Sequence, residues 1–371
     1  MSTHPTVRLG EVCRPRQWTT LSKKDMVNDG FAVYGANGKI GFATEFTHAK
    51  PTLLIGCRGS CGSVHITEAF SYANGNAMAL DDLDESIADL RYLYHYFLHR
   101  GFRDVITGTS QPQIIQQHLR QVEIPLPPLE EQRRIAAILD KASTIKRQSA
   151  QAFALAETLC LARLEQLLDM NKDLLVGQRL EELCVPGAPI TYGILQPGPD
   201  LDGGVPYVRP SEIKNSQVDL ERLKRTSPEI AQKYSKSQLR QGDILLTIVG
   251  TIGETAIVPA ELEGGNITQS SARIRIDTNL ANPLYIYYFL KAQHVNRQIE
   301  RDRLGVAVER LNLHHVRDIE ILCLPRCFQE KFTAEADSMK QLSSRHLRLA
   351  NHANSLLGSF SNSLLGSSQG P

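Results

Sequence analysis

The sequence has 371 residues, of which 42% are hydrophobic and 22% charged, and its formal net charge is +1. This length exceeds what one ordinary hydrophobic core supports, so we expect two domains or a repeated one. No run approaches the 18 apolar residues of a membrane-spanning helix, and the first residues lack the apolar core of a signal peptide, so we expect a cytoplasmic protein. The seven cysteines are an odd number and match no usual zinc spacing. They are therefore interpreted as reduced thiols, and no metal site is predicted.

Charge is distributed unevenly along the chain. Residues 209–240 carry eight basic side chains against four acidic ones, whereas residues 81–89 hold five acids and no base. A near-neutral total can therefore conceal a basic face of the kind that nucleic acids attract, although a solvated surface is the simpler interpretation of either segment.

Short apolar runs bounded by glycines predict strands in both halves of the chain. The runs at 53–56, 244–249 and 274–276 are interpreted as strands, with tight turns at the glycines that follow the first two. Tyrosine-rich and phenylalanine-rich segments near 91–100 and 283–293 have helical spacing. In the second of these, Pro283 fits the first helical turn and Asn282 its cap.

A long helix is predicted in the middle of the chain. Three prolines at 125, 127 and 128 end the preceding segment, and the acids Glu130 and Glu131 suit the positive end of a helix. Neither proline nor glycine occurs from 130 to 168, which predicts a rod of about 58 Å. A second, more polar helix is expected from about 328 to 357, followed by a disordered tail.

The two halves repeat one another. "LLIGCRGSCGSV" from residue 53 aligns with "DILLTIVGTIGETA" from residue 243, so that two glycines of each segment match at an offset of 191 residues. "YFL" at 96–98 matches "YFL" at 288–290, and "VEIPLPPLEEQ" from residue 122 matches "IEILCLPRCFQ" from residue 319. Landmarks in one order at a nearly constant offset indicate an internal duplication.

The duplication predicts the architecture. We expect an α+β protein in which two similar mixed α/β units are separated by two long helices. Because each helix follows one unit, the two helices can bury their apolar stripes against each other as an antiparallel coiled coil with pseudo-two-fold symmetry.

The motif search gives no catalytic residue. "NPLY" at 282–285 resembles an amino-methyltransferase motif, but Leu284 replaces its second proline and a helix cap explains it more simply. "GCRGSCG" at 56–62 lacks the Gly-Lys-Ser/Thr of a phosphate-binding loop, so a strand-turn-strand junction is favoured. The sequence contains none of the hydrolase, zinc-protease or dinucleotide-binding motifs that we searched for.

Paired domains joined by a spacer suit the recognition of two short DNA sites more than one duplex turn apart. Arginine, lysine, amide and hydroxyl side chains read base edges or hold phosphates, although each alone is more commonly an ordinary loop residue. The candidates lie on predicted loops: Asn37, Lys39, Arg58, Ser60, Ser110, Gln111 and Gln113 in the first unit, and Arg209, Ser211, Thr251, Gln269 and Arg310 in the second.

The sequence resembles the specificity subunits of type I restriction-modification systems. The resemblance covers nearly the whole chain and rests on "GTSQPQIIQQHLRQVEIPLPPLEEQRRIAAILDKA" from residue 108, and on "YVRPSEI", "GDILLTIVGTIG" and "NPLYIYYFL" in the second half. "IPLPPLEEQRRIA" is its most specific piece. The resemblance implies two target-recognition domains at 1–128 and 171–326, spacer helices at 129–170 and 327–358, and a tail at 359–371.

The same resemblance implies a non-catalytic chain that binds double-stranded DNA at a split sequence. Its partners would be two modification subunits, which carry S-adenosylmethionine and methylate adenine, and restriction subunits that use ATP and Mg²⁺. No cofactor is expected in this chain itself. The spacer helices would provide the docking site for the modification subunits, and the residues assigned to them are Gln132, Ile135, Ile138, Ala142, Ile145 and Gln329.

The sequence departs from the family pattern at two places, and two alternative functions stay open. The second junction, "LPRCFQEKF", is degraded relative to the first, and the first unit shows no clear partner for "YVRPSEI". A type IIB-like system, in which one partner both methylates and cuts, would use a similar subunit. An adaptor that joins proteins through the helix pair without touching DNA is the alternative from another class. The bases recognised and the spacer length are not deducible from the sequence.

Overall fold

The computed structural model describes residues 4–108, 111–303 and 309–341. These residues form two compact units, 4–148 and 149–341, which divide within one continuous helix, α4 (Leu129–Met170). The structure confirms the predicted long central helix. The assigned domain boundaries at 128, 170, 326 and 358 stay predictions.

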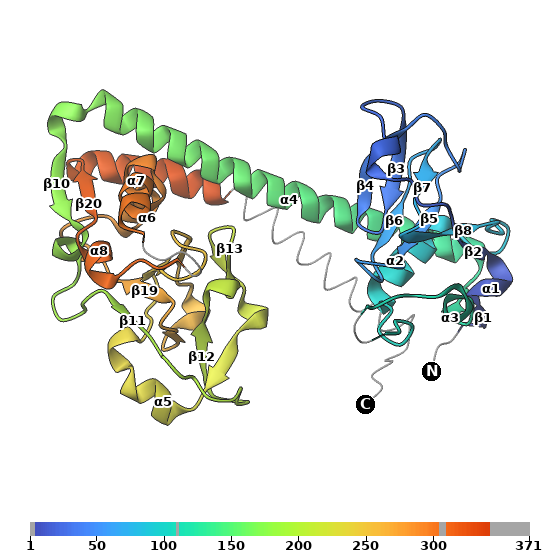
Figure 1. Cartoon of the computed structure of the whole chain (residues 1–371). Coiled ribbons are helices and arrows are strands. Elements are labelled where there is room, and N and C mark those ends of the chain that lie inside the picture. Colours follow the sequence, from blue (N-terminus) through green and yellow to red (C-terminus); the bar gives the residue numbers. More distant parts are fainter. Residues whose placement is uncertain (1–3, 109–110, 304–308, 342–371) are drawn as a thin grey trace. The chain divides into compact units, whose positions relative to one another are not determined.

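The first unit contains three sheets and short helices (Figure 1). Its four-stranded sheet has the order β2 (Arg14–Gln17), β8 (Ala77–Asp81), β5 (Leu53–Gly56) and β6 (Val64–Ile66). Its three-stranded sheet has the order β4 (Gly38–Ala43), β3 (Phe31–Gly35) and β7 (Tyr72–Ala73). The strands β1 (Thr6–Arg8) and β9 (Glu123–Pro125) form an antiparallel pair. The helices are α1 (Leu9–Val12), η1 (Lys23–Asp25), α2 (Leu90–Arg100) and α3 (Gln116–Arg120).

The second unit repeats this arrangement. Its four-stranded sheet has the order β11 (Thr191–Tyr192), β19 (Ser271–Ile274), β16 (Ile244–Thr247) and β17 (Thr255–Ile257). Its three-stranded sheet has the order β15 (Lys224–Thr226), β12 (Val205–Val208) and β18 (Asn266–Ile267). The pair β10 (Val176–Arg179) and β20 (Glu320–Cys323) corresponds to β1 and β9. The predicted strand at 274–276 is therefore wrong in its bounds, because β19 ends where that prediction begins.

The second unit contains more helices than the first, and it also has an inserted hairpin. The α-helices are α5 (Pro228–Lys233), α6 (Pro283–Lys291), α7 (Gln293–Asp302) and α8 (Leu313–Arg317). The short 3₁₀ helices are η2 (Lys172–Leu174), η3 (Leu180–Leu183), η4 (Pro210–Glu212), η5 (Leu220–Arg222), η6 (Ser235–Ser237) and η7 (Ala260–Leu262). A hairpin of β13 (Ile213–Lys214) and β14 (Gln217–Val218) lies between β12 and β15, where the first unit has a direct turn from β3 to β4.

The equivalence of β3 and β12 corrects the expectation that "YVRPSEI" has no partner in the first unit. Each of these strands runs parallel to a second strand, β7 and β18 respectively, and antiparallel to a third. The inserted hairpin and the following turns lengthen the chain after β12. The offset between the halves therefore changes at this point, which conceals the match in the sequence.

Helices α2 and α6 begin at matching caps. The Asp89 side chain accepts hydrogen bonds from the N–H groups of Arg91 and Tyr92, and the Asn282 side chain accepts one from Leu284. These bonds satisfy amide groups that have no partner within a helix. The structure thus confirms the cap predicted at Asn282, and with it the structural interpretation of "NPLY".

In the second unit, α4 pairs with a helix at 326–341 (Figure 1). Arg163 Nε donates to Glu335 Oε2 over 2.8 Å, and Cys160 Sγ lies 3.6 Å from Met339 Sδ. Since residue numbers rise along one helix as they fall along the other, the two helices run antiparallel, as predicted. The predicted continuation of the second helix to 358 and the tail at 359–371 lie outside the described residues.

Candidate nucleic-acid interface

Three loops of the first unit meet around a glycine turn after β5. Gly59 and Gly62 have φ angles of 74° and 82°, a left-handed conformation that glycine adopts without steric cost. The turn is joined to the loop before α3, because Ile114 N–H donates to Cys57 O over 3.0 Å and Arg58 forms an antiparallel bridge with Gln113. Ser63 Oγ donates to Ala36 O and so joins the turn to the β3–β4 hairpin.

The first reading cluster is the set of predicted residues on these three loops. Its described members all have exposed side chains and are Asn37, Lys39, Arg58, Ser60, Gln111 and Gln113. The structure therefore gathers side chains that are far apart in the sequence. Ser110, the remaining candidate of this unit, lies outside the described residues.

Lys39 is partly engaged within the first reading cluster. Its ammonium donates to Glu68 Oε1 over 2.9 Å and lies 4.5 Å from the centre of the Phe42 ring. The hydrogen bond that the Lys39 ammonium donates to Glu68 raises the pKa of Lys39 above its ordinary value. Because both side chains are about half exposed, this ion pair can be exchanged for a contact with an incoming anion at little cost.

The second unit repeats the same turn and bridge. Gly250 and Gly253 have φ angles of 77° and 93°, and Val249 bridges Arg310 as Arg58 bridges Gln113. Leu311 N–H donates to Ile248 O over 2.8 Å, the counterpart of the Ile114 bond. Two halves with little sequence identity thus fold the turn through the same hydrogen bonds.

The second reading cluster consists of the predicted residues around this turn, Thr251, Gln269, Arg310, Arg209 and Ser211. Ile248 N–H donates to Ser270 O over 2.9 Å, which places the segment after Gln269 beside the turn. Thr268 N–H donates to Val208 O over 3.1 Å, which joins the same segment to the strand before Arg209. Thr251, Gln269, Ser211 and Arg310 are exposed, and Arg209 is half-buried.

Arg209 is held in place by a buried carboxylate. Its guanidinium donates to both oxygens of Glu212, over 2.7 and 3.0 Å, and Ser211 Oγ donates to the same carboxylate over 2.7 Å. Burial alone raises the pKa of Glu212, but the hydrogen bonds from Arg209 and Ser211 outweigh it and hold that pKa below its ordinary value. Arg209 therefore presents a fixed planar group, and the Ser211 hydroxyl proton is already engaged.

The two junction glutamines form clamps inside their own units. Gln132 is fully buried and accepts a hydrogen bond from Asp89 N–H, while its amide donates to Ile87 O and Pro127 O over 2.8 and 2.9 Å. Gln329, which is 2% exposed, accepts from Asn282 N–H and donates to Leu324 O, both over 2.8 Å. In this conformation neither side chain offers a surface to a docking protein.

The other helix residues assigned to docking differ in exposure along α4. Ile135 and Ala142 are both 4% exposed, and Ile135 belongs to the core of the first unit. Ile138 is half-buried, and Ile145 is 36% exposed. The apolar stripe predicted from the sequence therefore covers the first unit near its start and reaches the surface farther along.

A repeat at the start of each unit escaped the sequence analysis. "RLGEVC" at 8–13 matches "RLEELC" at 179–184, at an offset of 171 residues. In both units the leucine N–H bonds to the residue before the last strand, Leu9 to Val122 O and Leu180 to Ile319 O. A search that allowed the offset to vary would have detected this pair.

The described residues show neither a metal-binding nor a membrane-spanning element. No group of three or more histidine, cysteine, aspartate or glutamate side chains in this part of the chain is arranged to hold a metal ion. None of the helices in the described ranges is both long and apolar enough to cross a bilayer.

Comparisons with known proteins point to one family. The family described as Type I restriction modification DNA specificity domain matches residues 1–152 and 199–334. The EcoBI specificity subunit of Escherichia coli, a type I restriction enzyme, is 28% identical over 316 residues, which cover 74% of this chain and 66% of that protein. A putative type I restriction enzyme specificity subunit of Haemophilus influenzae is 25% identical over 331 residues, covering 85% and 82% of the two chains.

A solved structure shares the fold. The crystal structure of a type I restriction-modification system S subunit from M. genitalium superposes with a TM-score of 0.62 at 16% identity, and the match covers 98% of this chain and 96% of that one. Its similarity extends over both units, and it supports the predicted α+β architecture of two mixed α/β units with long helices.

Proposed function

The chain belongs to the type I restriction modification DNA specificity family, and from this premise we propose that it is a DNA-recognition subunit whose two units each read one half of a split sequence. The observation that carries the proposal is the repeated turn. Each unit presents a glycine turn bridged to a second loop, by Arg58 and Gln113 in one and by Val249 and Arg310 in the other. Exposed polar side chains on both turns suit contacts with base edges and phosphates.

We infer further that the chain itself is non-catalytic and acts through partners. Modification subunits that bind S-adenosylmethionine would methylate adenine, and restriction subunits that use ATP and Mg²⁺ would cleave unmodified DNA. The support is the family membership together with the lack of a catalytic motif in the sequence. A translocase gene beside this one would favour the type I partner set, whereas a fused methyltransferase-nuclease gene would favour a type IIB-like set.

The experiment is a methylome comparison. The chain is co-expressed with the neighbouring modification gene, and adenine methylation is mapped across the host genome. We expect methylation at a split motif that disappears when this chain is left out. Methylation that persists unchanged without the chain would refute the proposal.

The function assigned to α4 is tested by lengthening it. A four-residue insertion beside Gln151, an exposed position of α4, adds about one helical turn. We expect the methylated motif to keep both half-sites and gain spacer length. A change in the identity of either half-site would contradict a spacer function of the helix.

A direct binding measurement separates DNA recognition from the adaptor alternative. Contacts with phosphates release counterions, so the affinity for duplex DNA falls steeply as salt rises. An adaptor that joins proteins without touching DNA would show no such dependence.

A further inference from the structure

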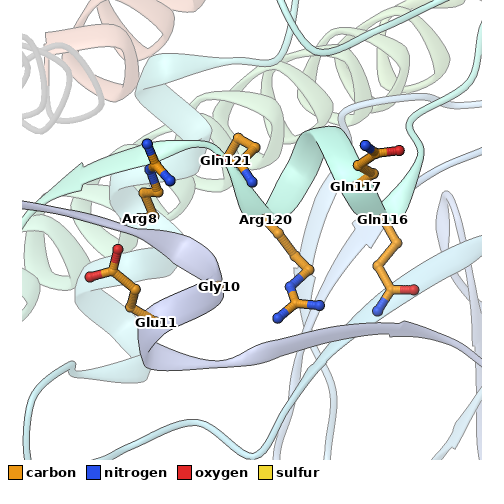
Figure 2. Close-up of a pocket in the computed structure, with 7 residues that line it drawn as sticks. All are labelled: Arg8, Gly10, Glu11, Gln116, Gln117, Arg120 and Gln121. Carbon is orange, nitrogen blue, oxygen red and sulfur yellow. The ribbon is translucent and has the colours of Figure 1, made fainter.

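A pocket of about 380 Å³ lies between α1 and α3 of the first unit. Polar side chains and one glycine line it: Arg8, Gly10, Glu11, Gln116, Gln117, Arg120 and Gln121. Figure 2 shows that the side chains of Arg120 and Gln116 point to the same side of α3. Glu11 follows Gly10 on α1 in the same view. Two arginines and three glutamines supply many hydrogen-bond donors at this place, against one carboxylate.

The two arginines of the pocket have no carboxylate partner in the described part of the chain. Gly10 allows Arg120 to lie against α1, because a Cβ at Gly10 would meet both Cβ and Nε of Arg120 at 3.1 Å. That distance is tighter than ordinary van der Waals contact, so a larger residue at this position would displace the arginine side chain.

In the second unit, carboxylate side chains neutralise the positive charge at the corresponding site. Arg179, the counterpart of Arg8, is bonded to three carboxylates, Glu181 over 3.0 Å, Glu182 over 3.0 Å and Asp318 over 3.2 Å. Two of these acids replace uncharged residues of the first unit, since Glu181 corresponds to Gly10 and Asp318 to Gln121. Arg317, the counterpart of Arg120, donates instead to Ile190 O over 2.9 Å. The two units therefore differ most clearly at Arg179, which is paired with carboxylates, and Arg8, which has no such partner in the described residues.

Unpaired arginines beside amide groups fit a phosphate group. Guanidinium groups form charge-assisted hydrogen bonds to phosphate oxygens, and glutamine amides are common contacts of nucleic-acid backbones. The pocket also adjoins the first reading cluster, because α3 starts three residues after Gln113, a reach of at most about 10 Å. A duplex bound at Gln113 would bring its backbone close to this pocket.

We propose that the pocket between α1 and α3 binds a backbone phosphate of the DNA that flanks the first half-site, through Arg8, Arg120 and Gln116. This inference rests on the proposed DNA-recognition function and adds an asymmetry to it. The first unit has an additional phosphate contact, whereas the second unit has none at the equivalent place. Glu11 opposes the phosphate and moderates its binding.

The test measures binding of the full chain, co-purified with its modification subunit, to a duplex that carries the methylated motif. The variants are Arg8→Gln and Arg120→Gln. Arg103→Gln removes one positive charge from an exposed position of the same unit outside the pocket, and Arg179→Gln changes the paired arginine of the second unit. Affinity is measured over a range of salt concentrations, and melting temperature shows that each variant is folded.

We expect Arg120→Gln to lower affinity roughly fivefold and to reduce the slope of log affinity against log salt by about 0.9. Arg8→Gln should act in the same direction, while Arg103→Gln and Arg179→Gln should change the slope much less. The methylated motif should stay the same in all four, because phosphate contacts carry no base information. Glu11→Gln should raise affinity.

Slopes of the Arg8 and Arg120 variants equal to that of Arg103→Gln would overturn the inference. A second arm titrates inorganic phosphate alone and follows the melting temperature. If Arg120→Gln abolished stabilisation by inorganic phosphate but left the DNA slope unchanged, the pocket would take a free phosphate and the backbone assignment would be wrong. If the unaltered complex showed no salt-dependent binding at all, the proposed function itself would fail.

Discussion

The two units place a carboxylate of α4 against the same position of their tyrosine-rich helices, but in different surroundings. In the first unit Asp140 bonds to His95 and Arg91 of α2, over 2.9 and 2.7 Å, and its side chain is 32% exposed. In the second unit Glu157 bonds to Lys291, Tyr287 and Tyr288 of α6, and its side chain is 10% exposed. One fold therefore anchors the helix by a partly exposed carboxylate in one unit and by a buried network in the other.

The largest effect is expected from Glu157→Ala. Removing one partner of a buried ion pair leaves the Lys291 and Lys340 charges poorly compensated, which costs about 3–5 kcal/mol of unfolding free energy. Asp140→Ala should cost about 1 kcal/mol, because Asp140 is itself partly exposed and water screens its ion pair with Arg91, whose side chain is 64% exposed. Hydrogen exchange reports on each unit separately, so the loss of protection should appear in the altered unit. Equal losses of stability in the two variants would contradict the claim that the more buried carboxylate contributes more.

The same network predicts a pH dependence. Burial alone would raise the pKa of Glu157, but Lys291 and Lys340 outweigh it and hold the pKa below its ordinary value of 4.5. Since the folded state favours the ionised form, its contribution to stability is present above pH 4.5 and is lost as pH falls below that value. The stability difference between the unaltered protein and Glu157→Gln should therefore shrink on acidification, as measured by urea unfolding at several pH values.

The junction glutamines give the next largest contrast. Gln132→Ala would leave the Asp89 N–H and two carbonyls without partners in the interior, at a cost of about 3 kcal/mol. Gln329→Ala removes two bonds instead of three and should cost about 2 kcal/mol. Gln148 is an exposed residue of α4, and Gln148→Ala serves as the control. It should lower the unfolding free energy by less than about 0.5 kcal/mol. If Gln148→Ala lowered the unfolding free energy as much as Gln132→Ala, the stabilising function assigned to the Gln132 hydrogen bonds would be wrong.

A smaller contrast is expected at the repeated turns. An alanine Cβ at Gly62 would lie 3.2 Å from the Phe102 ring, whereas at Gly253 the nearest atom is Ile299 Cδ1 at 3.9 Å. Both changes force alanine into the left-handed region, at about 1 kcal/mol. Gly62→Ala adds the cost of crowding and should reach about 2 kcal/mol. Thermal unfolding of the two variants measures the difference, and a larger loss for Gly253→Ala would contradict it.

Much of the fold followed from local signals in the sequence. The central helix was predictable because prolines and acids mark its start and neither proline nor glycine interrupts it. The turns were predictable because Gly59 and Gly62, and their counterparts Gly250 and Gly253, occupy left-handed positions where glycine is favoured. Caps such as Asn282 were predictable because their hydrogen bonds are made within a few residues.

The rest depends on contacts that local sequence does not report. Gln132 was assigned to a docking surface because the family resemblance gives that function to the spacer helices, yet it is buried against backbone groups more than 40 residues away. The match of β3 with β12 was concealed by the inserted hairpin. Arg209 was predicted only as a candidate DNA-contacting loop residue, and its partner Glu212 became apparent only from the structure. That these side chains contact DNA stays a prediction.

The central claim is that each unit reads its own half of the target, and exchange of one unit tests it most directly. Residues 1–124 are replaced by the corresponding segment of a family member with a different target, and the methylome of the hybrid is mapped. We expect one half of the split motif to change while the other half stays the same. A motif in which both halves change, or neither does, would contradict independent recognition by the two units.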